Sequence, residues 1–194
     1  MSHLRVYKCF TFMLRVIAGQ YKSRKIKEVP SKLTRPTTDK NKEVIFNSIG
    51  QFFNGGNCLD LYAGSGALGI EAISRGIDHC DFVDKQYLAI KIIRDNIRLL
   101  DLNQMANIIK KDAIQFLNTT KNRYDLILID PPYRLKPYQD ILQLIHSRQL
   151  IKKHGIIVME SDDQTSLKDY KDIKNIKEKS LGQTKITIFR REIL

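Results

Sequence analysis

Hydrophobic and polar positions change their period along the chain, and the change separates two regions. From residue 57 onward, short apolar runs typical of buried strands alternate with segments whose apolar residues recur every three or four positions. Strands separated by helical segments of about 10 to 15 residues favour a doubly wound parallel sheet. The predicted strands are residues 57–62, 79–83, 106–109, 124–129 and 155–159, followed by a closing hairpin of residues 173–179 and 184–190. The predicted helices are one that ends at Arg75 and others at residues 89–100, 113–117 and 138–145.

A hairpin and one helix are predicted before this alternating region. Residues 14–17 and 24–29 carry strand-forming side chains on either side of a glycine turn, as in a short hairpin. Thr37 or Thr38 can cap the start of a helix, and Gly50 can end it. The apolar face of that helix is expected at Val44, Ile45, Ile49 and Phe52.

The length of 194 residues fits one domain with a small appendage. We interpret residues 1–13 as a leader or disordered tail, because Met13 and the residues after it resemble a natural start. Residues 14–50 form the basic arm and helix, and residues 51–194 form the α/β domain. The apolar runs are all shorter than the roughly 20 residues that cross a bilayer, so a membrane protein is not indicated.

Positive charge is concentrated near the N-terminus. The formal net charge is +12, and the segment from Arg15 to Lys42 holds nine basic and two acidic residues. A lysine-rich source proteome could raise the charge everywhere, but it would not concentrate more than half of it in 28 residues. Such a field attracts polyanions, so nucleic acid is the predicted partner.

The three cysteines form no CxxC pair, and the four histidines lack the spacing of metal ligands. Cys58 and Cys80 are interpreted as small buried hydrophobic residues. We therefore predict a reducing cytoplasm, no disulfide framework and no metal.

The most informative stretch reads DLILIDPPY, from Asp125 to Tyr133. Its apolar run fits a strand buried on both faces, which places Asp130 at the carboxyl edge of the sheet, where ligands bind. Pro131 and Pro132 stiffen the turn and remove two backbone donors, so the turn presents acceptors, and Tyr133 adds a flat ring. The alternative is that the prolines only end a strand and that Asp130 is a solvated turn residue.

A second candidate site lies in residues 60–69, DLYAGSGALG, where three glycines follow the pattern G-x-G-x-x-G between a strand and a helix. Glycine allows a tight turn and the close approach of a ligand. Asp84 stands 18 residues after Gly66, at the end of the next strand, and offers two acceptors to a ribose diol. A nucleoside-containing cofactor is predicted, although NAD and S-adenosylmethionine both carry adenosine and a purely structural turn is an alternative.

Asp112 ends the third strand and faces the same predicted cleft. Its carboxylate could accept a hydrogen bond from an adenine amino group. It could equally cap the helix that starts at Ala113, and the two roles do not exclude each other.

The turn after Asp130 helps to identify the reaction. A hydride-transfer enzyme has no obvious use for it, whereas methyl transfer to an exocyclic amine does. The Asp130 carboxylate and the Pro131 carbonyl could hold the two N–H groups of the amine, so that its nitrogen lone pair faces a sulfonium methyl group. Tyr133 would stack on the base, a contact worth about 1–3 kcal/mol in nucleic-acid complexes.

These motifs together resemble the RsmD family, the 16S ribosomal RNA guanine-N2 methyltransferases of the class I S-adenosylmethionine-dependent group. The Asp-Pro-Pro-aromatic motif alone is shared with adenine-N6 and cytosine-N4 enzymes. The segments that narrow the resemblance are Leu33–Asp39, Phe46-Asn47, Leu59–Glu71 and Met159–Ser161. The likeness covers residues 14–190 and implies a Rossmann-like, mostly parallel sheet with one antiparallel strand near the C-terminus, behind a small basic hairpin.

The resemblance also implies roles for individual residues. The catalytic residues would be Asp130, Pro131, Pro132 and Tyr133. The cofactor-binding residues would be Asp60, Tyr62, Ala63, Gly64, Ser65, Gly66, Asp84, Asp112 and Ala113. Arg35 and Thr37 would lie over the cleft, and Lys22, Arg24 and Lys25 of the basic arm would bind phosphate. The chain departs from the family at Ala18 and Ser23, where the family has glycines, and at Tyr133, where phenylalanine is common.

We therefore predict a cytoplasmic methyltransferase that acts on guanine N2 in 16S ribosomal RNA, with an assembled small subunit as its partner. One alternative is a DNA adenine-N6 or cytosine-N4 methyltransferase. Another is a non-catalytic RNA-binding protein of ribosome assembly. A nicotinamide dehydrogenase is a more distant alternative.

Overall fold

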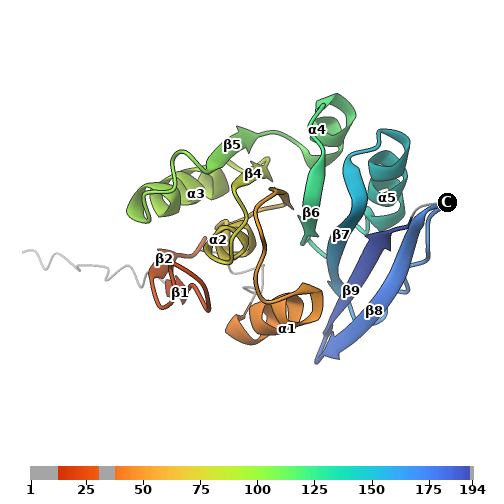
Figure 1. The fold of residues 1–194 in the computed structure, drawn as a ribbon, viewed down its shortest axis with the longest axis horizontal. Coiled ribbons are helices and arrows are strands. Elements are labelled where there is room, and N and C mark those ends of the chain that lie inside the picture. The colour runs from red at the N-terminus through yellow and green to blue at the C-terminus, as the bar shows by residue number, and fades with distance from the viewer. Residues whose placement is uncertain (1–12, 31–37, 193–194) are drawn as a thin grey trace, which may run out of the picture.

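The computed structural model describes residues 13–30 and 38–192 (Figure 1). Residues 1–12 of the predicted tail, the alternative helix cap Thr37, and Arg35 lie outside the described residues.

The described chain is built on one sheet of seven strands (Figure 1). In spatial order they are β5 (Ala106–Lys110), β4 (His79–Asp84), β3 (Asn57–Leu61), β6 (Tyr124–Ile129), β7 (Ile151–Asp162), β9 (Thr184–Arg191) and β8 (Ile173–Leu181). Neighbouring strands run parallel from β5 to β7, and β9 runs antiparallel to both β7 and β8. The predicted α/β class, with a mostly parallel sheet and one antiparallel strand, is confirmed.

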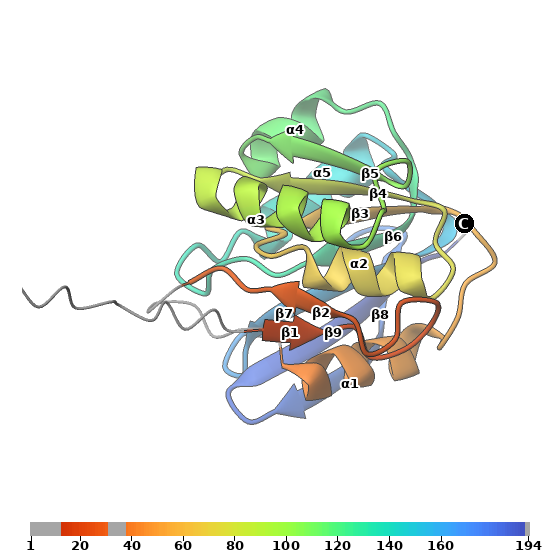
Figure 2. The same ribbon diagram turned by 90° about the vertical axis from the view of Figure 1, so that its left-hand side faces the viewer.

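Helices cover both faces of the sheet. They are α1 (Asp39–Ile49), α2 (Ala67–Ser74), α3 (Tyr87–Leu99), α4 (Ala113–Thr119) and α5 (Tyr138–Ser147). Apolar side chains of α1, α2 and α3 pack on one face, and those of α4 and α5 pack on the other. Figure 2 shows the first three helices toward the viewer. None of the described helices combines the length and the apolar character that crossing a membrane requires.

Strand β6 has the predicted bounds and is buried on both sides. Leu126 and Leu128 belong to the core under α1, α2 and α3, whereas Ile127 and Ile129 belong to the core under α4 and α5. None of these four side chains is more than 1% exposed. The absence of polar residues from Leu126 to Ile129 follows from this double burial. Cys58 and Cys80 are also buried, as predicted.

Two local predictions are wrong. Phe52 is 65% exposed and lies beyond α1, because Gly50 adopts a φ of 119° and turns the chain away from the helix. Phe46 is buried in α1 instead, and its ring meets Phe53 edge-on with the centroids 6.3 Å apart. Strand β7 begins at Ile151, four residues before the predicted start, because the chain bulges there rather than ends.

The predicted hairpin forms as β1 (Met13–Arg15) and β2 (Lys25–Lys27), paired antiparallel, and lies along α2 (Figure 2). The buried carboxylate of Glu71 in α2 accepts hydrogen bonds from the backbone N–H groups of Ile17 and Ala18, at 2.8 and 3.0 Å. At the end of α2, the Ser74 carbonyl accepts from Gln20 N at 2.8 Å. The helix thus satisfies backbone groups of the hairpin turn, which attaches the hairpin firmly to the domain.

Candidate active site

Two sequence-distant loops meet where the strand order reverses. Strands β3 and β6 are parallel neighbours, with Leu61 opposite Ile129, so their carboxyl ends lie side by side. The Asp130 N–H donates to the Leu61 carbonyl at 3.4 Å, across the ends of these strands. Crevices at such reversal points are the usual ligand sites of open α/β sheets. The glycine-rich loop after β3 and the Asp-Pro-Pro-Tyr turn after β6 therefore form one candidate site.

The glycine-rich loop depends on backbone conformations that favour glycine. Gly64 has a φ of 55° and Gly66 a φ of 78°. At Gly69 the requirement is space, because an added Cβ would lie 2.4 Å from the Phe82 ring and 2.8 Å from the Cys80 sulfur. The glycines thus make the turn and allow α2 to pack closely on the sheet.

Two aspartate side chains accept hydrogen bonds from backbone N–H groups of this loop and of the helix that follows it. The Asp60 side chain, 1% exposed, accepts from the Gly69 N–H at 2.9 Å, and Asp84 accepts from the Gly64 N–H at 3.0 Å. The other Asp84 oxygen accepts from the Gln86 N–H at 2.8 Å. Burial raises the pKa of Asp60 well above its usual range, and the charges of Asp130 and Asp84 raise that pKa further. Three aspartates that the sequence assigned to the site, Asp60, Asp84 and Asp130, therefore lie near one another at the ends of neighbouring strands.

This arrangement distinguishes between the nucleoside cofactors that the sequence left open. A dinucleotide pyrophosphate is usually bound by free N–H groups of the loop and the following helix N-terminus. Here carboxylates accept the Gly64 and Gly69 N–H groups, and the Gly66 N–H donates to the Ala63 carbonyl at 2.7 Å. Aspartate oxygens at these positions suit a cationic ligand and a ribose diol better than they suit a phosphate.

Asp112 performs the helix-capping role that the sequence allowed. One of its oxygens accepts from the N–H groups of Ile114 and Gln115, at 3.0 and 3.4 Å, at the start of α4. Tyr62 lies nearby with a φ of 59°. Burial raises the pKa of Tyr62 to about 12, and the Asp112 charge contributes to the shift. Tyr62, Asp112 and the buried Ala113 thus lie at one end of the candidate site.

The turn after β6 is anchored by its tyrosine. Pro131 is buried and Pro132 exposed, and the Leu135 N–H donates back to the Pro132 carbonyl at 2.9 Å. The Tyr133 hydroxyl forms a hydrogen bond of 2.9 Å with the hydroxyl of Thr184, at the start of β9. The ring at the edge of the site is therefore held by the C-terminal hairpin.

The sequence interpretation assigned no site role to two residues beside this turn, although one of them belongs to the segment Met159–Ser161 that narrowed the resemblance. Glu160, 6% exposed at the end of β7, accepts from the Asn41 side chain of α1 at 3.5 Å. The Tyr138 hydroxyl is buried and has no hydrogen-bond partner among the described residues. Burial and the nearby charges of Asp162, Tyr133, Asp130 and Glu160 raise the pKa of Tyr138. The available signal in the sequence was a polar group within an otherwise apolar segment, Glu160 in β7 and the Tyr138 hydroxyl in α5.

The basic residues of the arm are not adjacent to Asp130. Lys22, Arg24 and Lys25 are exposed, and the Arg24 guanidinium donates to the Leu99 carbonyl at the end of α3. The hairpin turn lies at the end of α2, roughly 12 Å along the helix from the glycine-rich loop, given a rise of about 1.5 Å per residue. The hairpin turn thus lies at the end of α2 that is distant from the glycine-rich loop.

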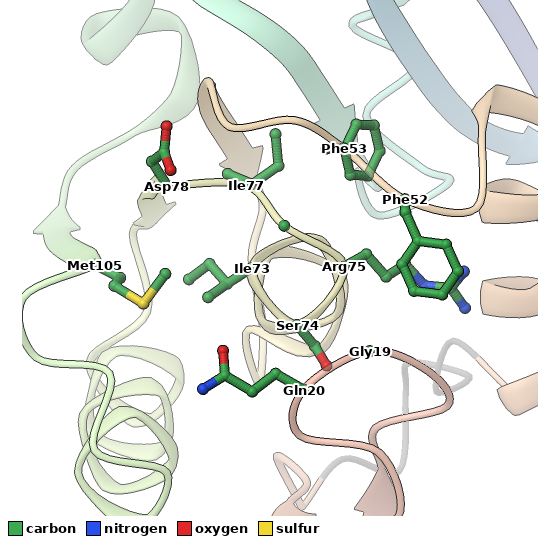
Figure 3. A pocket seen from close by; sticks show the side chains of 11 residues that line it. Gly19, Gln20, Phe52, Phe53, Ile73, Ser74, Arg75, Ile77, Asp78 and Met105 are labelled. Carbon is green, nitrogen blue, oxygen red and sulfur yellow. The ribbon is translucent and has the colours of Figure 1, made fainter.

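A hollow of about 680 Å³ also lies at that end of α2, lined in part by Gly19, Gln20, Phe52, Ser74 and Met105 (Figure 3). None of the predicted site residues lines it. Within the described residues, no group of three or more His, Cys, Asp or Glu side chains is placed to hold a metal ion.

The class I methyltransferase fold is defined here by the strand order and by the two adjacent loops after β3 and β6. The carboxylates of Asp60 and Asp84, which accept hydrogen bonds from backbone N–H groups, are part of the same arrangement. The chain belongs to the family described as "Conserved hypothetical protein 95", which matches residues 14–190. This confirms the resemblance to the RsmD family that the motifs indicated.

Similarity to individual proteins extends along almost the whole chain. The chain is 41% identical to YlbH of Bacillus subtilis over 182 residues, which cover 92% of this chain and 99% of YlbH. It is 34% identical to ribosomal RNA small subunit methyltransferase D of Buchnera aphidicola subsp. Acyrthosiphon pisum, with 78% and 80% of the chains covered. The solved structure of Escherichia coli yhhF superimposes with a TM-score of 0.82 and 27% identity, covering 94% of this chain and 100% of that one.

Proposed function

We propose that this protein transfers a methyl group from S-adenosylmethionine to the N2 amine of a guanine in 16S ribosomal RNA. The observation that carries the proposal is the adjacency of two loops, the acidic glycine-rich loop after β3 and the Asp-Pro-Pro-Tyr turn after β6. One loop suits a cationic nucleoside cofactor, and the other suits an amine with two N–H groups. Family membership supports the RNA substrate, because similar proteins carry the name ribosomal RNA small subunit methyltransferase D.

The cofactor would occupy the cleft above β3 and β4. Asp84 would accept hydrogen bonds from the ribose diol, Asp112 and Ala113 would lie beside the adenine, and residues 60–66 would line the rest of the cleft. Bound S-adenosylmethionine supplies an electrophilic methyl group on a positively charged sulfur. The Asp84 carboxylate would complement that charge.

The target amine would bind at the turn. The Asp130 carboxylate and the Pro131 carbonyl would each accept a hydrogen bond from one N–H of the guanine N2 group, and Tyr133 would stack on the base. The lone pair of this nitrogen is delocalised into the ring, so holding it in line with the methyl group is most of the catalysis. Transfer would form the N–C bond as the S–C bond breaks, leaving S-adenosylhomocysteine, and the proton lost by the nitrogen would pass to solvent. The choice of guanine N2 over other amines rests on the family resemblance.

The basic arm would hold the RNA while the target base is unpaired or flipped. Lys22, Arg24 and Lys25 would contact phosphates at a distance from the target nucleotide. Arg35 and Thr37, which lie outside the described residues, are expected over the cleft on the strength of the resemblance. The described chain has one catalytic sheet and one short arm, so we propose that an assembled small subunit in the cytoplasm supplies much of the specificity.

The proposal is tested with 16S RNA and small subunits from a strain that lacks this gene, with tritiated S-adenosylmethionine as methyl donor. We expect tritium in N2-methylguanosine and faster labelling of subunits than of naked RNA. Asp130→Ala should lower the rate at least about 100-fold, as loss of a positioned group does in other active sites, while the affinity for S-adenosylhomocysteine stays within about threefold. Asp140→Ala, which removes an exposed carboxylate from α5, is the matched control and should leave the rate unchanged.

Each alternative predicts a different result. Label in N6-methyladenine or N4-methylcytosine would refute guanine as the target. Full activity of Asp130→Ala would refute the site assignment, and equal labelling of naked RNA would refute the role of the assembled subunit. A wild-type protein that binds RNA but neither binds nor uses the cofactor would be a non-catalytic assembly protein.

A further inference from the structure

One buried amide joins the basic arm to the glycine-rich loop. Asn96 lies on α3 among the residues that face the sheet, and its side chain is fully buried. Its oxygen accepts from the Lys27 N–H at 2.8 Å, and its nitrogen donates to the carbonyls of Lys27 and Ser65, both at 2.9 Å. A single side chain thus satisfies backbone groups of both segments.

On the arm side, Asn96 holds both backbone groups of Lys27, the last residue of β2. The Lys27 ammonium also pairs with the Asp95 carboxylate at 2.8 Å. Asn96 therefore holds the backbone at the point where the chain leaves the hairpin, whereas Asp95 contacts only the Lys27 side chain. Movement of this strand would be transmitted directly to the Asn96 amide.

On the loop side, Asn96 orients one peptide plane. The Ser65 carbonyl accepts from Asn96, and the Gly66 N–H of the same peptide donates to the Ala63 carbonyl at 2.7 Å. Gly66, the N-cap residue of α2, has a φ of 78°. The conformation of the loop that lines the cofactor cleft therefore depends on a group that the arm also holds.

We propose that Asn96 couples RNA binding on the arm to cofactor binding in the glycine-rich loop, an inference that rests on the proposed function. A buried amide is stable only with all its partners in place, since an unmade hydrogen bond in this environment is costly. RNA that stabilises β2 in this position thus also stabilises the Asn96 orientation that holds the Ser65 peptide. By thermodynamic linkage the cofactor strengthens RNA binding by the same factor.

The affinity for S-adenosylhomocysteine is measured by calorimetry with and without a saturating fragment of 16S RNA, using the full chain. The reciprocal RNA affinity is measured with and without S-adenosylhomocysteine. For the wild type we expect each ligand to strengthen the other about fivefold or more, the lower end of common coupling factors. Asn96→Ala should reduce this factor to about one. Asp95→Ala is the matched control, because it releases the Lys27 side chain without touching the loop, and it should keep the wild-type factor.

Hydrogen exchange of the wild type gives a test that needs no variant. Addition of the RNA fragment without cofactor should slow exchange of the Gly66 amide, while the remote Gly182 amide in the β8–β9 turn keeps its rate. Independent binding of the two ligands by the wild type would refute the coupling but not the proposed function. If Asn96→Ala binds each ligand more weakly but keeps the full coupling factor, Asn96 has only a structural role, and the inference is overturned. Failure to bind either ligand would contradict the proposed function itself, and the inference with it.

Discussion

At the scale of single residues, the tyrosine of the Asp-Pro-Pro-Tyr turn forms a hydrogen bond with the C-terminal hairpin. Tyr133 and Thr184 are 51 positions apart, and their hydroxyls form a hydrogen bond of 2.9 Å. Thr184 is only 3% exposed, so loss of its partner would leave a buried hydroxyl without that bond. The bond orients the ring, whereas the proposed stacking needs only the ring itself.

Replacement of Tyr133 separates these two contributions. Tyr133→Phe should lower the free energy of unfolding by about 1 kcal/mol, because a net hydrogen bond is lost, and should change kcat/KM for RNA only slightly. Tyr133→Ala should lower kcat/KM about 5- to 150-fold, the equivalent of about 1–3 kcal/mol of stacking. Urea unfolding and methyl-transfer kinetics provide the measurements. An equal loss of kcat/KM in both variants would show that the hydroxyl matters for the reaction.

Asp172 provides a pH-dependent contact far from the active site. Its carboxylate pairs with Nδ1 of His146 at 2.5 Å and with the Arg191 guanidinium at 2.8 Å. Burial raises its pKa, but Arg191 and His146 together lower the pKa below the ordinary value of 3.8. Because the folded pKa is the lower one, this stabilisation is complete above about pH 4 and is lost as the pH falls through the folded pKa.

Asp172→Asn should therefore lower the free energy of unfolding at pH 7 by about 2 kcal/mol, the value of a charge-assisted contact. Below pH 4 the gap between variant and wild type should narrow as the wild-type carboxylate is protonated. Urea unfolding at several pH values measures both effects, with Asp140→Asn as an exposed control. A difference in the free energy of unfolding between variant and wild type that stays constant down to pH 2 would contradict the stabilising role of ionised Asp172.

At the scale of elements, the basic hairpin depends on close contact with the end of α2. Gly19 has a φ of 83°, and a Cβ there would lie 1.7 Å from the Ser74 carbonyl oxygen. That carbonyl also accepts from Gln20 N, and the Ser74 hydroxyl donates to the Ala18 carbonyl at 2.5 Å. The sequence predicted two strands around a glycine, but it could not predict that the turn packs on α2, because that contact joins residues more than 50 positions apart.

Two glycine substitutions distinguish this packing from conformational strain. Gly19→Ala should displace the hairpin turn from α2, since backbone atoms block the new Cβ. Gly182→Ala has a similar strain, with a φ of 63°, but nothing within 4 Å of the added Cβ, so it should cost only about 1 kcal/mol. Limited proteolysis should cut residues 18–24 faster in Gly19→Ala only, and its RNA affinity should fall. Equal proteolysis of the two variants would mean that close packing on α2 is unimportant.

At the scale of the whole molecule, exposed positive charge on the arm is separated from a group of aspartates at the strand ends. Lys22, Arg24 and Lys25 are exposed on the hairpin, whereas Asp60, Asp84 and Asp130 lie near one another at the ends of β3, β4 and β6. This separation suits the proposed function, because the arm attracts the RNA backbone while the cleft receives a cationic cofactor and an amine.

Salt dependence measures the contribution of the arm. Each phosphate contact to single-stranded RNA contributes roughly 0.7 to the slope of log K against log salt concentration, so replacing Lys22, Arg24 and Lys25 with glutamine should reduce the slope by about 2. The control replaces Lys121, Lys153 and Lys171, exposed residues just before or at the start of β6, β7 and β8. That control removes the same charge and should leave the slope nearly unchanged. Equal slopes for both triple variants would mean that only net charge matters.

The sequence by itself determined the elements and the chemistry that each one carries. The bounds of β6 and the location of α5 agree with predictions made from local patterns, and the tight turn expected of the glycine pattern is present. These features depend on neighbouring residues along the chain, because burial period, glycine conformation and proline stiffness are local properties.

The tertiary structure alone decided which loops meet and which groups hold them. It placed Asp130 beside Leu61, turned the Asp60 carboxylate to the N-terminus of α2, and connected Lys27 to Ser65 through Asn96. Each contact joins residues from different elements, so it exists only once the sheet is assembled and the helices are packed on it. Side-chain hydrogen bonds of this kind have no period in the sequence, and for that reason the pattern of residues alone could not predict them.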